Sequence, residues 1–488
     1  MIRHLPVFTV VGLLICAYLL PLFKSRFRVF GQIFTLLALI ASAVASLYFL
    51  ITTGTGEVIR YAVGGWNAPY GIEIMVTPLT AVVMLIVSTV TALVYLYRIF
   101  DTSAPQGQAA SWYDAVILLL VAGIFGIAQA SDLFNLFVFI EICSLSACAL
   151  VAASKEAKAA EAAFKYLMLC TIGSGFVLFA IGLLYIITGY LSFSYVHDSL
   201  QTVWMVYPHA VYLSASFFIV GLGIKAALFP LHVWLPDAHS AAPTTSSALL
   251  SAIAVKAYIL ALFKLFYLVF GQDLIQKLAV DKVLLFLGVA GVLGGSLFAL
   301  VQSDMKRMLA YSTVAQLGYI FIGIGLGNVA GLTAAIFQFA SHATMKATLF
   351  LVAGYFASQG KKKLVDYAGL GKTEPVMFGA FTVAALSMIG FPLLSGFITK
   401  WYLFKASLDL QQYGVVIVIV LSGLLNAAYF LPVLWLGWFG SEKPYTRLRL
   451  RPSHMLPVAL SILVVYLGIA PNGLLKVMAI AVTQMLRW

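Results

Sequence analysis

The sequence predicts an all-α integral membrane protein with about fourteen membrane-spanning helices. Three observations predict this class. Of the 488 residues, 62% are hydrophobic and 9% are charged, whereas soluble domains are about 45–50% apolar and about 25% charged. Apolar segments of about 20 residues, the length that crosses a hydrocarbon core, recur along nearly the whole chain. The basic residues between these segments gather in alternate loops, as the orientation of membrane helices requires.

The predicted spans occupy most of the chain and leave no room for a soluble nucleotide- or flavin-binding module. The longer hydrophilic stretches are 53–77 and 189–208. Glycines, Asn67 and Pro69 in the first stretch predict a short external hairpin that covers helix ends. The predicted spans are 5–22, 29–52, 78–97, 112–131, 133–153, 163–188, 209–235, 245–270, 282–302, 308–327, 329–357, 375–403, 413–438 and 454–471.

Loops after the even-numbered spans hold few basic residues: Arg60, Lys277 and Lys282. Loops and helix ends after the odd-numbered spans hold many, except after the seventh span. Cytoplasmic loops carry the excess of lysine and arginine, so the loops after the odd-numbered spans are predicted to lie in the cytoplasm. The chain is thus expected to be a multi-pass protein of the cell inner (cytoplasmic) membrane, with both termini on the outer side. The formal charge of +12 therefore indicates orientation, and no nucleic-acid partner is expected. The basic residues after odd-numbered spans are Lys24, Arg26, Arg28, Arg98, Lys155, Lys158, Lys165, Lys306, Arg307, Lys361, Lys362, Lys363, Lys372, Lys443, Arg447, Arg449 and Arg451.

The cysteines favour neither a metal site nor redox chemistry. All four lie in apolar segments and none forms a CxxC pair, so zinc, iron–sulfur and thiol-redox sites lack support. We expect these cysteines to be small hydrophobic residues in helix cores. The sequence offers no catalytic chemistry and no cofactor site on this chain. The cysteines are Cys16, Cys143, Cys148 and Cys170.

Ionisable residues deep in the spans are the candidate functional residues, because each costs about 2.5–3.5 kcal/mol at mid-membrane. Glu141, in LFNLFVFIEICSLSACALV, is the only one of seventeen carboxylates that lies deep in a span. Lys225 precedes Pro230 and Pro236, which predict a break in the seventh helix. Broken helices near the bilayer midplane build ion sites in transporters. Burial disfavours a charged lysine and a nearby carboxylate favours it, so we expect Glu141 and Lys225 to pair as a switch.

Further buried lysines point to the same chemistry. Lys256 lies in the middle of the eighth span, whereas Lys264 is expected to extend to an interface. Lys400 follows Pro392 and small residues, a pattern that predicts a second broken helix in the twelfth span. Asp114 and Asp132 lie at helix starts, where they are expected to cap a helix or face water.

Histidines extend this set of candidates. His342 and Lys346, spaced i and i+4, lie on one face of the eleventh span. Histidine titrates near neutral pH and suits a proton relay; a metal site would lack two coordinating partners. His232, Asp237 and His239, near the end of the seventh span, could line a channel mouth, and capping at the interface is the alternative.

These residues lie in motifs that resemble a known family. KAALFPLHVWLPDAHSAAP, followed by SALLSAIAVKAY, is similar to the signature of antiporter-like membrane subunits. These subunits occur in respiratory complex I, in group 4 membrane-bound hydrogenases and in Mrp-type cation/proton antiporters. Supporting matches run from residue 64 to residue 401: GGWNAPYGI, DLFNLFVFIEICSLSA, SDMKRMLAYSTVAQLGY, SHATMKATLFLVAG and GFPLLSGFITKW.

The resemblance implies two inverted five-helix repeats, spans 4–8 and 9–13, with helices 7 and 12 broken at Pro230 and Pro392. The predicted units are 1–111 (three helices and the hairpin), 112–270 (first repeat), 282–438 (second repeat) and 454–488 (a final helix and tail). The family's ion-carrying positions fall on Glu141, Lys225, Lys256, His342 and Lys400, and every expected position is filled.

The resemblance also implies a function. We expect the chain to be one subunit of a larger membrane assembly that moves protons, or exchanges a cation for protons. Its partners are expected to be other membrane subunits of the same complex, including related antiporter-like ones. The motif HVWLPDAHSAAP favours coupling to a hydrogenase or NADH dehydrogenase, with the redox chemistry on partner subunits. The alternative is a D-type subunit of a redox-independent Mrp Na⁺/H⁺ antiporter, which Lys400 also suits. Other rivals are a free-standing small-solute transporter, a subunit that itself binds quinone, and a structural spacer.

Overall fold

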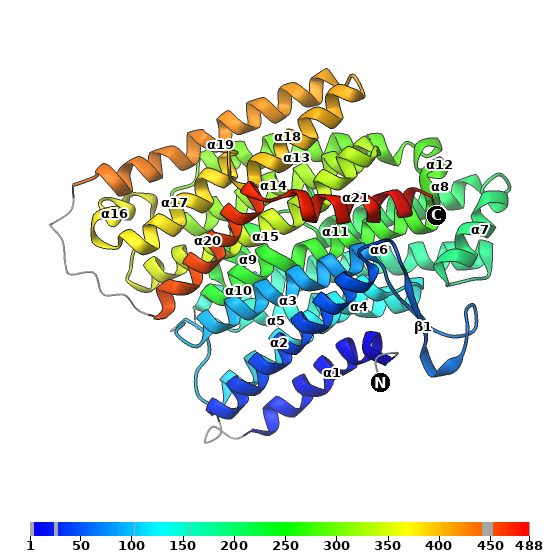
Figure 1. Cartoon of the computed structure of the whole chain (residues 1–488), viewed down its shortest axis with the longest axis horizontal. Helices are drawn as coiled ribbons and strands as arrows, with labels where there is room; N and C mark the ends of the chain where they lie inside the picture. Colours follow the sequence, from blue (N-terminus) through cyan, green and yellow to red (C-terminus); the bar gives the residue numbers. More distant parts are fainter. Residues whose placement is uncertain (1–3, 24–27, 102, 155, 442–451, 488) are drawn as a thin grey trace.

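The computed structural model describes residues 4–23, 28–101, 103–154, 156–441 and 452–487. In these ranges the chain is a bundle of helices with one antiparallel hairpin, β1 (Ile59–Ala62) and β2 (Glu73–Val76). The hairpin expected within 53–77 is therefore confirmed. It lies at the same end of the bundle as both termini (Figure 1). Seven basic residues used for the predicted orientation lie outside the described ranges: Lys24, Arg26, Lys155, Lys443, Arg447, Arg449 and Arg451.

Within the described residues, twelve helices are long and apolar enough to cross a membrane. α15 (Val329–Ser358) is long but less apolar, and α17 (Pro375–Ile389) and α18 (Ser395–Asp409) are shorter. The all-helical membrane class is confirmed, whereas the count of about fourteen and the inverted repeats stay predictions. The twelve are Leu5–Leu22 (α1, Leu5–Leu19, with the turn after it), α2 (Arg28–Thr53), α3 (Pro78–Arg98), α4 (Ala109–Gln129), α5 (Leu133–Ala152), α6 (Ala157–Thr188), α8 (Pro208–Lys225), Thr244–Lys277, α13 (Val280–Leu300), α14 (Met305–Leu326), α19 (Tyr413–Phe439) and α20 (Pro452–Ile469).

Helices are interrupted near the proline-rich motifs. α8 ends at Lys225, and the next helix, α9 (Leu235–Ala241), begins ten residues later, beyond Pro230. Pro236 lies in the first turn of α9, where a proline has no backbone hydrogen bond to remove. The expectation that Pro236 breaks a helix is therefore wrong, because this residue begins one. Pro392 lies between the end of α17 and the start of α18.

A third irregularity, in the segment Thr244–Lys277, was not expected from the sequence. α10 (Thr244–Leu249) passes into a π-helical turn, Leu250–Ala254, and then into α11 (Val255–Lys264). A second π-helical turn, Leu265–Phe270, precedes α12 (Gly271–Lys277). Such turns widen a helix and leave carbonyl groups without their usual intrahelical partners.

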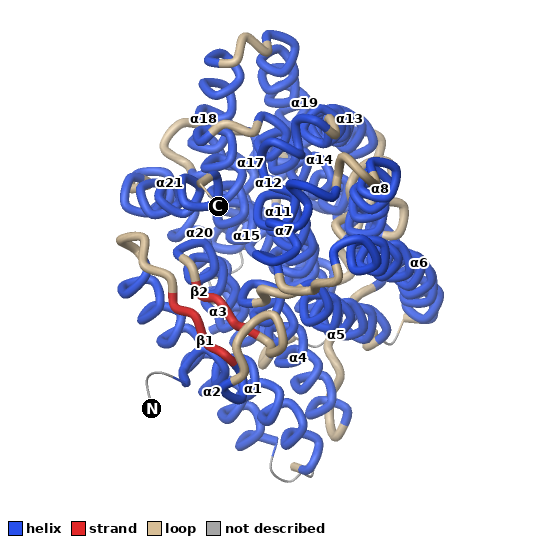
Figure 2. Tube along the Cα trace, turned by 90° about the vertical axis from the view of Figure 1, so that its right-hand side faces the viewer, coloured by secondary structure: helices blue, strands red, loops and turns tan. Residues whose placement is uncertain are grey.

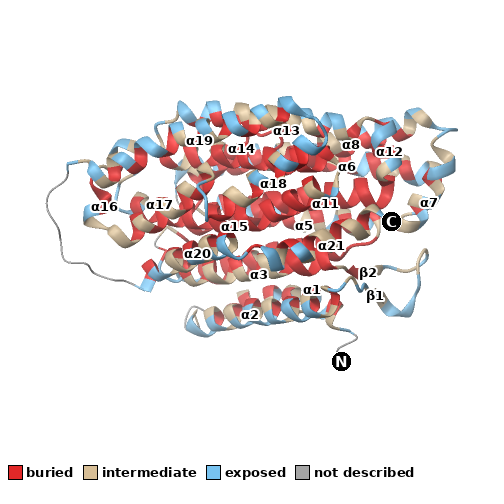
Figure 3. Cartoon of the chain, turned by 45° about the horizontal axis from the view of Figure 1, so that its top comes forward, coloured by how far each residue is buried: buried red, intermediate tan, exposed pale blue. Residues whose placement is uncertain are grey.

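The most buried helices form the centre of the bundle. Every residue of the most apolar window of Thr244–Lys277 is buried, and 94% of the corresponding window of α14 is buried. By contrast, only 28% of the window of α2 is buried. α11 and α15 lie near the middle of the end-on view, with α2 and α6 at the periphery (Figure 2). Figure 3 gives the same pattern, with buried residues along α15 and α11 and exposed ones on α2 and α19.

Two shorter helices occupy regions that were expected to be loop or tail. α7 (Phe193–Val203) lies within the predicted hydrophilic stretch 189–208. α21 (Asn472–Leu486) follows α20 in the predicted tail and packs against α15 and α3. Both are too short to cross a bilayer as straight helices, which need about 20 residues.

Candidate functional site

Glu141 and Lys225 form an ion pair between α5 and α8. Lys225 Nζ lies 3.1 Å from Glu141 Oε1 and donates to Ser144 Oγ at 2.7 Å. Ser174 Oγ on α6 donates to the same carboxylate oxygen at 2.5 Å. The expected pair is therefore present. Lys225 is fully buried, whereas the Glu141 side chain is 30% exposed, so this carboxylate lies at the lateral surface of the chain.

Lys256 is solvated by backbone carbonyls and not by a carboxylate. Its Nζ donates to the carbonyl oxygens of Ser251 at 2.8 Å and Ala252 at 2.5 Å. Both carbonyls belong to the π-helical turn that precedes α11, where the regular hydrogen-bond pattern is lost. The face of the Phe339 ring lies 5.8 Å from the ammonium group and adds a cation–π contact.

His342 and Lys346 lie on α15 and are both fully buried. Lys346 Nζ donates to the Leu309 carbonyl at 2.7 Å and to the Ser312 hydroxyl, both on α14. Among the described residues, neither ring nitrogen of His342 has a hydrogen-bond partner, although Lys256 and Lys346 are near enough for their charges to act on the ring. A buried histidine without a partner is costly and has capacity to accept or donate a proton.

Lys400 lies in α18, one turn beyond the break after α17. Its Nζ donates to the carbonyls of Met388 at 3.1 Å and Ile389 at 2.6 Å. These carbonyls end α17, so no further turn of helix satisfies them. The Tyr319 ring lies 5.3 Å below the ammonium group. The broken helix therefore creates the acceptors that the lysine needs.

His232, Asp237 and His239 do not share one environment. His239 is fully buried, stacks on Phe350 at 4.8 Å and, in the described part of the chain, has no partner for either ring nitrogen. Asp237 is half-buried and pairs with Arg307 at 2.9 Å. His232 lies under an aromatic cluster, 5.1 Å from Phe229. Of these three residues, it is Asp237 that lines an open cavity.

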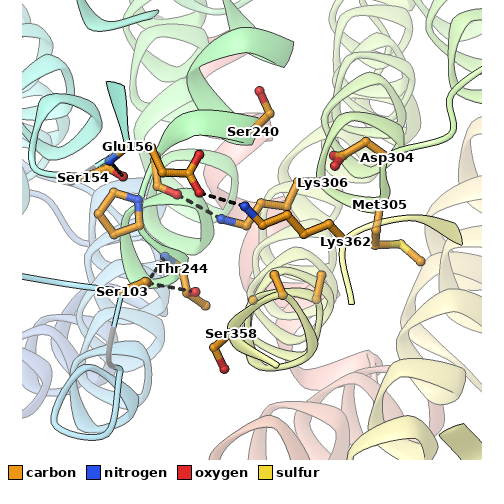
Figure 4. A pocket seen from close by; sticks show the side chains of 15 residues that line it. Ser103, Ser154, Glu156, Ser240, Thr244, Asp304, Met305, Lys306, Ser358 and Lys362 are labelled. Carbon is orange, nitrogen blue, oxygen red and sulfur yellow. Dashed lines mark hydrogen bonds and ion pairs between the residues drawn. The ribbon is translucent and has the colours of Figure 1, made fainter. Parts of the chain in front are cut away.

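Two neighbouring polar cavities open at the end of the bundle opposite the termini. One of about 370 Å³ lies between the α9–α10 junction and the ends of α14 and α15 (Figure 4). The other, of about 460 Å³, extends past Asp237 to α6. Lys362 pairs with Glu156 at 2.9 Å across the first cavity, and Lys306 donates to the Ala242 carbonyl at 2.9 Å.

Two further buried charges, those of Lys264 and Asp114, have structural partners that the sequence did not reveal. Lys264 is 3% exposed and donates to the carbonyls of Ile127, Ala128 and Ala130 at 3.1, 2.7 and 2.6 Å. It satisfies the C-terminal end of α4, so the expectation that it extends to an interface is wrong.

The two aspartates expected at helix starts behave differently. Asp114 lies inside α4 and forms a buried ion pair with Arg98 on α3 at 2.9 Å, so the expectation of a cap or a solvated group is wrong for this residue. Asp132 does cap α5, accepting from the Asn135 amide at 2.7 Å. Burial raises the pKa of Asp132, opposed by those backbone amides and by the charge of Lys264.

Several polar residues near the lysines were missed in the sequence. Ser312, Gln316 and Tyr319 on α14, and Asn426 and Tyr429 on α19, are buried among the central helices. An isolated amide or hydroxyl in an apolar span is common enough that hydropathy does not distinguish it. Pairwise spacing on α14 was the one available signal, since Ser312, Gln316 and Tyr319 recur at intervals of three or four residues.

The described residues contain no group of three or more histidine, cysteine or acidic side chains that could hold a metal ion. The candidate site instead combines the carboxylate of Glu141 with lysines, histidines, amides and hydroxyls. Ionisable residues inside membrane helices mark ion pathways and proton relays. Fold and site together define a polytopic membrane protein with ionisable side chains buried among its helices.

The family follows from comparison with known proteins. Residues 130–426 match the family described as NADH:quinone oxidoreductase/Mrp antiporter, transmembrane region. The match covers more than half of the chain, and the chain therefore belongs to this family of antiporter-like membrane subunits. The expected resemblance is confirmed.

Similar curated proteins come from both branches of the family. The N-type subunit of the NADH-quinone oxidoreductase of Desulforudis audaxviator is 38% identical, with 96% of each chain covered. The D-type subunit of the Na⁺/H⁺ antiporter of Alkalihalophilus pseudofirmus is 30% identical, with 83% of this chain and 81% of the relative covered.

Solved structures agree with the fold. A chain of the membrane-bound sulfane sulfur reductase, an archaeal respiratory membrane complex, superposes with a TM-score of 0.91 at 28% identity, covering 99% of this chain and 98% of that one. A chain of the Mrp complex from Dietzia sp. superposes with a TM-score of 0.89 at 24% identity over 99% and 97% of the two chains, which supports the fold alone.

Proposed function

We propose that this chain translocates protons, or exchanges a cation for protons, as one subunit of a multisubunit membrane complex. Ions would pass along a buried axis through Glu141, Lys225, Lys256, His342 and Lys400, with Lys346 beside His342. The observation that carries the proposal is the solvation of the lysines. Three of them are held by neutral carbonyl and hydroxyl groups, which accept an ammonium group without requiring one permanently.

Glu141 and Lys225 would act as a switch at one end of the axis. While the pair is closed, the carboxylate stabilises the ammonium form of Lys225. Opening the pair removes that stabilisation and favours proton release toward Lys256. Because Glu141 is partly exposed at the lateral surface, a neighbouring subunit could contact it and open or close the ion pair with Lys225.

The polar cavities near α9 would be the ion entrance on the cytoplasmic side. His239 lies two residues beyond Asp237 and one before Ser240, which lines both cavities. Among the described residues its ring nitrogens have no hydrogen-bond partner, and the ring is near enough to Lys346 and Lys256 for their charges to act on it. His239 would therefore pass protons from the cavity to the axis, while His232, under its aromatic cluster, has no part in this route.

Coupling to redox chemistry in partner subunits is favoured over a redox-independent antiporter. The 38% identical relative is named as a subunit of NADH-quinone oxidoreductase, and the solved chain at 28% identity belongs to a sulfane sulfur reductase. The second candidate is the D-type subunit of an Mrp antiporter, which the relative at 30% identity supports. In either assembly the partners would be other membrane subunits, including related antiporter-like ones, within the cytoplasmic membrane.

Replacement of Glu141 tests the proposal. In membrane vesicles that contain the assembled complex, Glu141→Gln is expected to lower proton transport about tenfold or more. The substitution leaves the fully buried Lys225 ammonium without its carboxylate, and an unpaired buried charge costs about 3–5 kcal/mol. Lys225→Ala and Lys400→Ala are expected to do the same. Transport is measured by the quenching of a pH-sensitive dye, normalised to assembled complex.

Glu73→Gln is the matched control, since the Glu73 side chain pairs with Arg60 at 3.3 Å in the hairpin and is not among the residues of the proposed axis. It is expected to leave transport unchanged. Full transport by Glu141→Gln and Lys400→Ala together would contradict the proposal and favour a structural spacer.

A further inference from the structure

Asn426 and Tyr429, one turn apart on α19, have no role in the axis described above. Both are buried. The Tyr429 hydroxyl donates to Asn426 Oδ1 at 2.6 Å, and Asn426 Nδ2 donates to the Met388 carbonyl at 3.0 Å. Lys400 Nζ donates to that same carbonyl at 3.1 Å. The two side chains therefore end on the acceptor that binds Lys400.

The other end of this pair lies near Ser312, which is a hydrogen-bond partner of Lys346. The Tyr429 hydroxyl is near enough to Ser312 on α14 to interact with it. The Ser312 hydroxyl in turn accepts a hydrogen bond from Lys346 Nζ. A row of polar groups thus runs from Lys346 through Ser312, Tyr429 and Asn426 toward Lys400.

A second row reaches the same carbonyl from α15. Gln338 Nε2 donates to Gln316 Oε1 at 2.8 Å, and Gln316 Nε2 lies 3.4 Å from the Met388 carbonyl oxygen. The carbonyl thus has three side-chain donors: Gln316, Asn426 and Lys400. It is available to them because α17 ends at the next residue and continues no helical ladder.

Packing alone does not account for these polar groups. A buried amide or hydroxyl needs partners to offset the loss of water, and an apolar side chain of similar shape would fill the same space without that requirement. Networks of buried hydrogen bonds also polarise one another, so a change of charge at one end is felt at the other.

We propose that Asn426 and Tyr429 are positioning residues that couple Lys346 to Lys400. The inference rests on the proposed function and extends it by naming the elements that join two of its sites. An amide neither gains nor loses a proton under ordinary conditions, so the pair does not carry the ion. It holds the Ser312 hydroxyl and the Met388 carbonyl in place, so that a proton leaving the Lys346 ammonium through water is taken up by a neutral Lys400 amine.

The test is the pH profile of transport by the assembled complex in membrane vesicles. Tyr429→Phe is expected to lower transport about fivefold, the equivalent of one lost buried hydrogen bond. It is also expected to move at least one limb of the profile by about half a pH unit or more, since the solvation of a titrating lysine changes. Asn426→Ala, which removes only the amide, carries the same expectation and replaces Tyr429→Phe where that variant does not assemble.

Tyr267→Phe is the matched control. It removes a buried tyrosine hydroxyl bonded at 3.0 Å to the Ile324 carbonyl, which is not among the acceptors of Lys346 or Lys400. It is expected to keep the pH profile. If Tyr429→Phe and Asn426→Ala lower transport only in proportion to assembled complex and keep the profile, the coupling is overturned. If Lys400→Ala also transports normally, the proposed function fails as well, so the two failures are distinguishable.

Discussion

At the scale of the residue, the buried lysines differ in what they bond to. Lys225 has a carboxylate, Lys256 and Lys400 have backbone carbonyls, and Lys264 has three carbonyls at the end of α4. A nearby carboxylate strongly favours the protonated form of a lysine, and it is left as an unpaired anion when the lysine loses its proton. A carbonyl is neutral, so a lysine bound only to carbonyls can release its proton without leaving an unpaired anion. Lys264 resembles Lys400 in binding carbonyls at a helix end, and it differs from Lys400 in having three such acceptors instead of two.

Lys264→Met is expected to lower stability without directly affecting transport. The substitution keeps the apolar stem but leaves the Ile127, Ala128 and Ala130 carbonyls without their ammonium donor. Loss of these bonds is expected to lower the free energy of unfolding by about 1–3 kcal/mol. The measurement is the thermal unfolding midpoint of the purified complex, together with transport per assembled complex.

Lys282→Met serves as the control, because Lys282 is exposed at the start of α13. It is expected to leave the midpoint unchanged. A Lys264 variant of normal stability that has lost transport would contradict the structural role and add Lys264 to the ion axis.

At the scale of the element, irregular helices supply the acceptors of the axis. A regular helix satisfies its carbonyls internally, so lysines beside it would have only side chains to bind. The π-helical turn before Lys256 and the end of α17 near Lys400 both expose carbonyls. The position of each irregular segment relative to its neighbour is therefore as important as the lysine itself.

Gly396→Ala tests this dependence at the second break. A Cβ atom at Gly396 would lie 1.9 Å from the Ser387 carbonyl oxygen, so the start of α18 must move away from α17. That movement separates Lys400 from the Met388 and Ile389 carbonyls. Transport per assembled complex is expected to fall by about tenfold or more, since two charge-assisted bonds are disturbed.

Gly379→Ala is the matched control on α17, where an added Cβ meets no described atom within 4 Å. Transport should stay at the unmodified level. Normal transport by Gly396→Ala would mean that the contact between Lys400 and the helix end is not required.

At the scale of the whole molecule, the arrangement encloses Lys225, Lys256, His342 and Lys346 in protein, whereas Glu141 and Lys400 are partly exposed. The central helices are enclosed, and the lipid-facing surface is left to helices such as α2 and α19 (Figure 3). The polar cavities open at one end of the bundle, and both termini lie at the other (Figure 1). This asymmetry gives the proposed entrance a definite side.

Labelling of introduced cysteines tests that side. Ser240→Cys, in the cavity, is expected to react with a membrane-impermeant maleimide in inside-out vesicles and not in intact cells, because the positive-inside rule assigns that end to the cytoplasm. Gln201→Cys on α7, an exposed position at the opposite end, is expected to react only from outside. The native cysteines are buried or half-buried, which keeps background labelling low. The reverse pattern would invert the proposed orientation.

Sequence was sufficient for properties that depend on one segment at a time. Hydropathy over a helix length identified the membrane class and most spans. The depth of Glu141, Lys225, Lys256 and Lys400 in the membrane stays a prediction. The breaks near Pro230 and Pro392 followed from local backbone chemistry.

Partner choice depended on packing between helices, which no single segment encodes. Lys264 binds carbonyls at the end of α4, and Asp114 pairs with Arg98 on α3, so both partners come from other helices. Lys256 binds carbonyls of the π-helical turn before it, which exist as free acceptors because the helical pitch changes there. Hydropathy measures the cost of burying a charge, whereas the group that offsets that cost is selected by the lateral arrangement of the bundle.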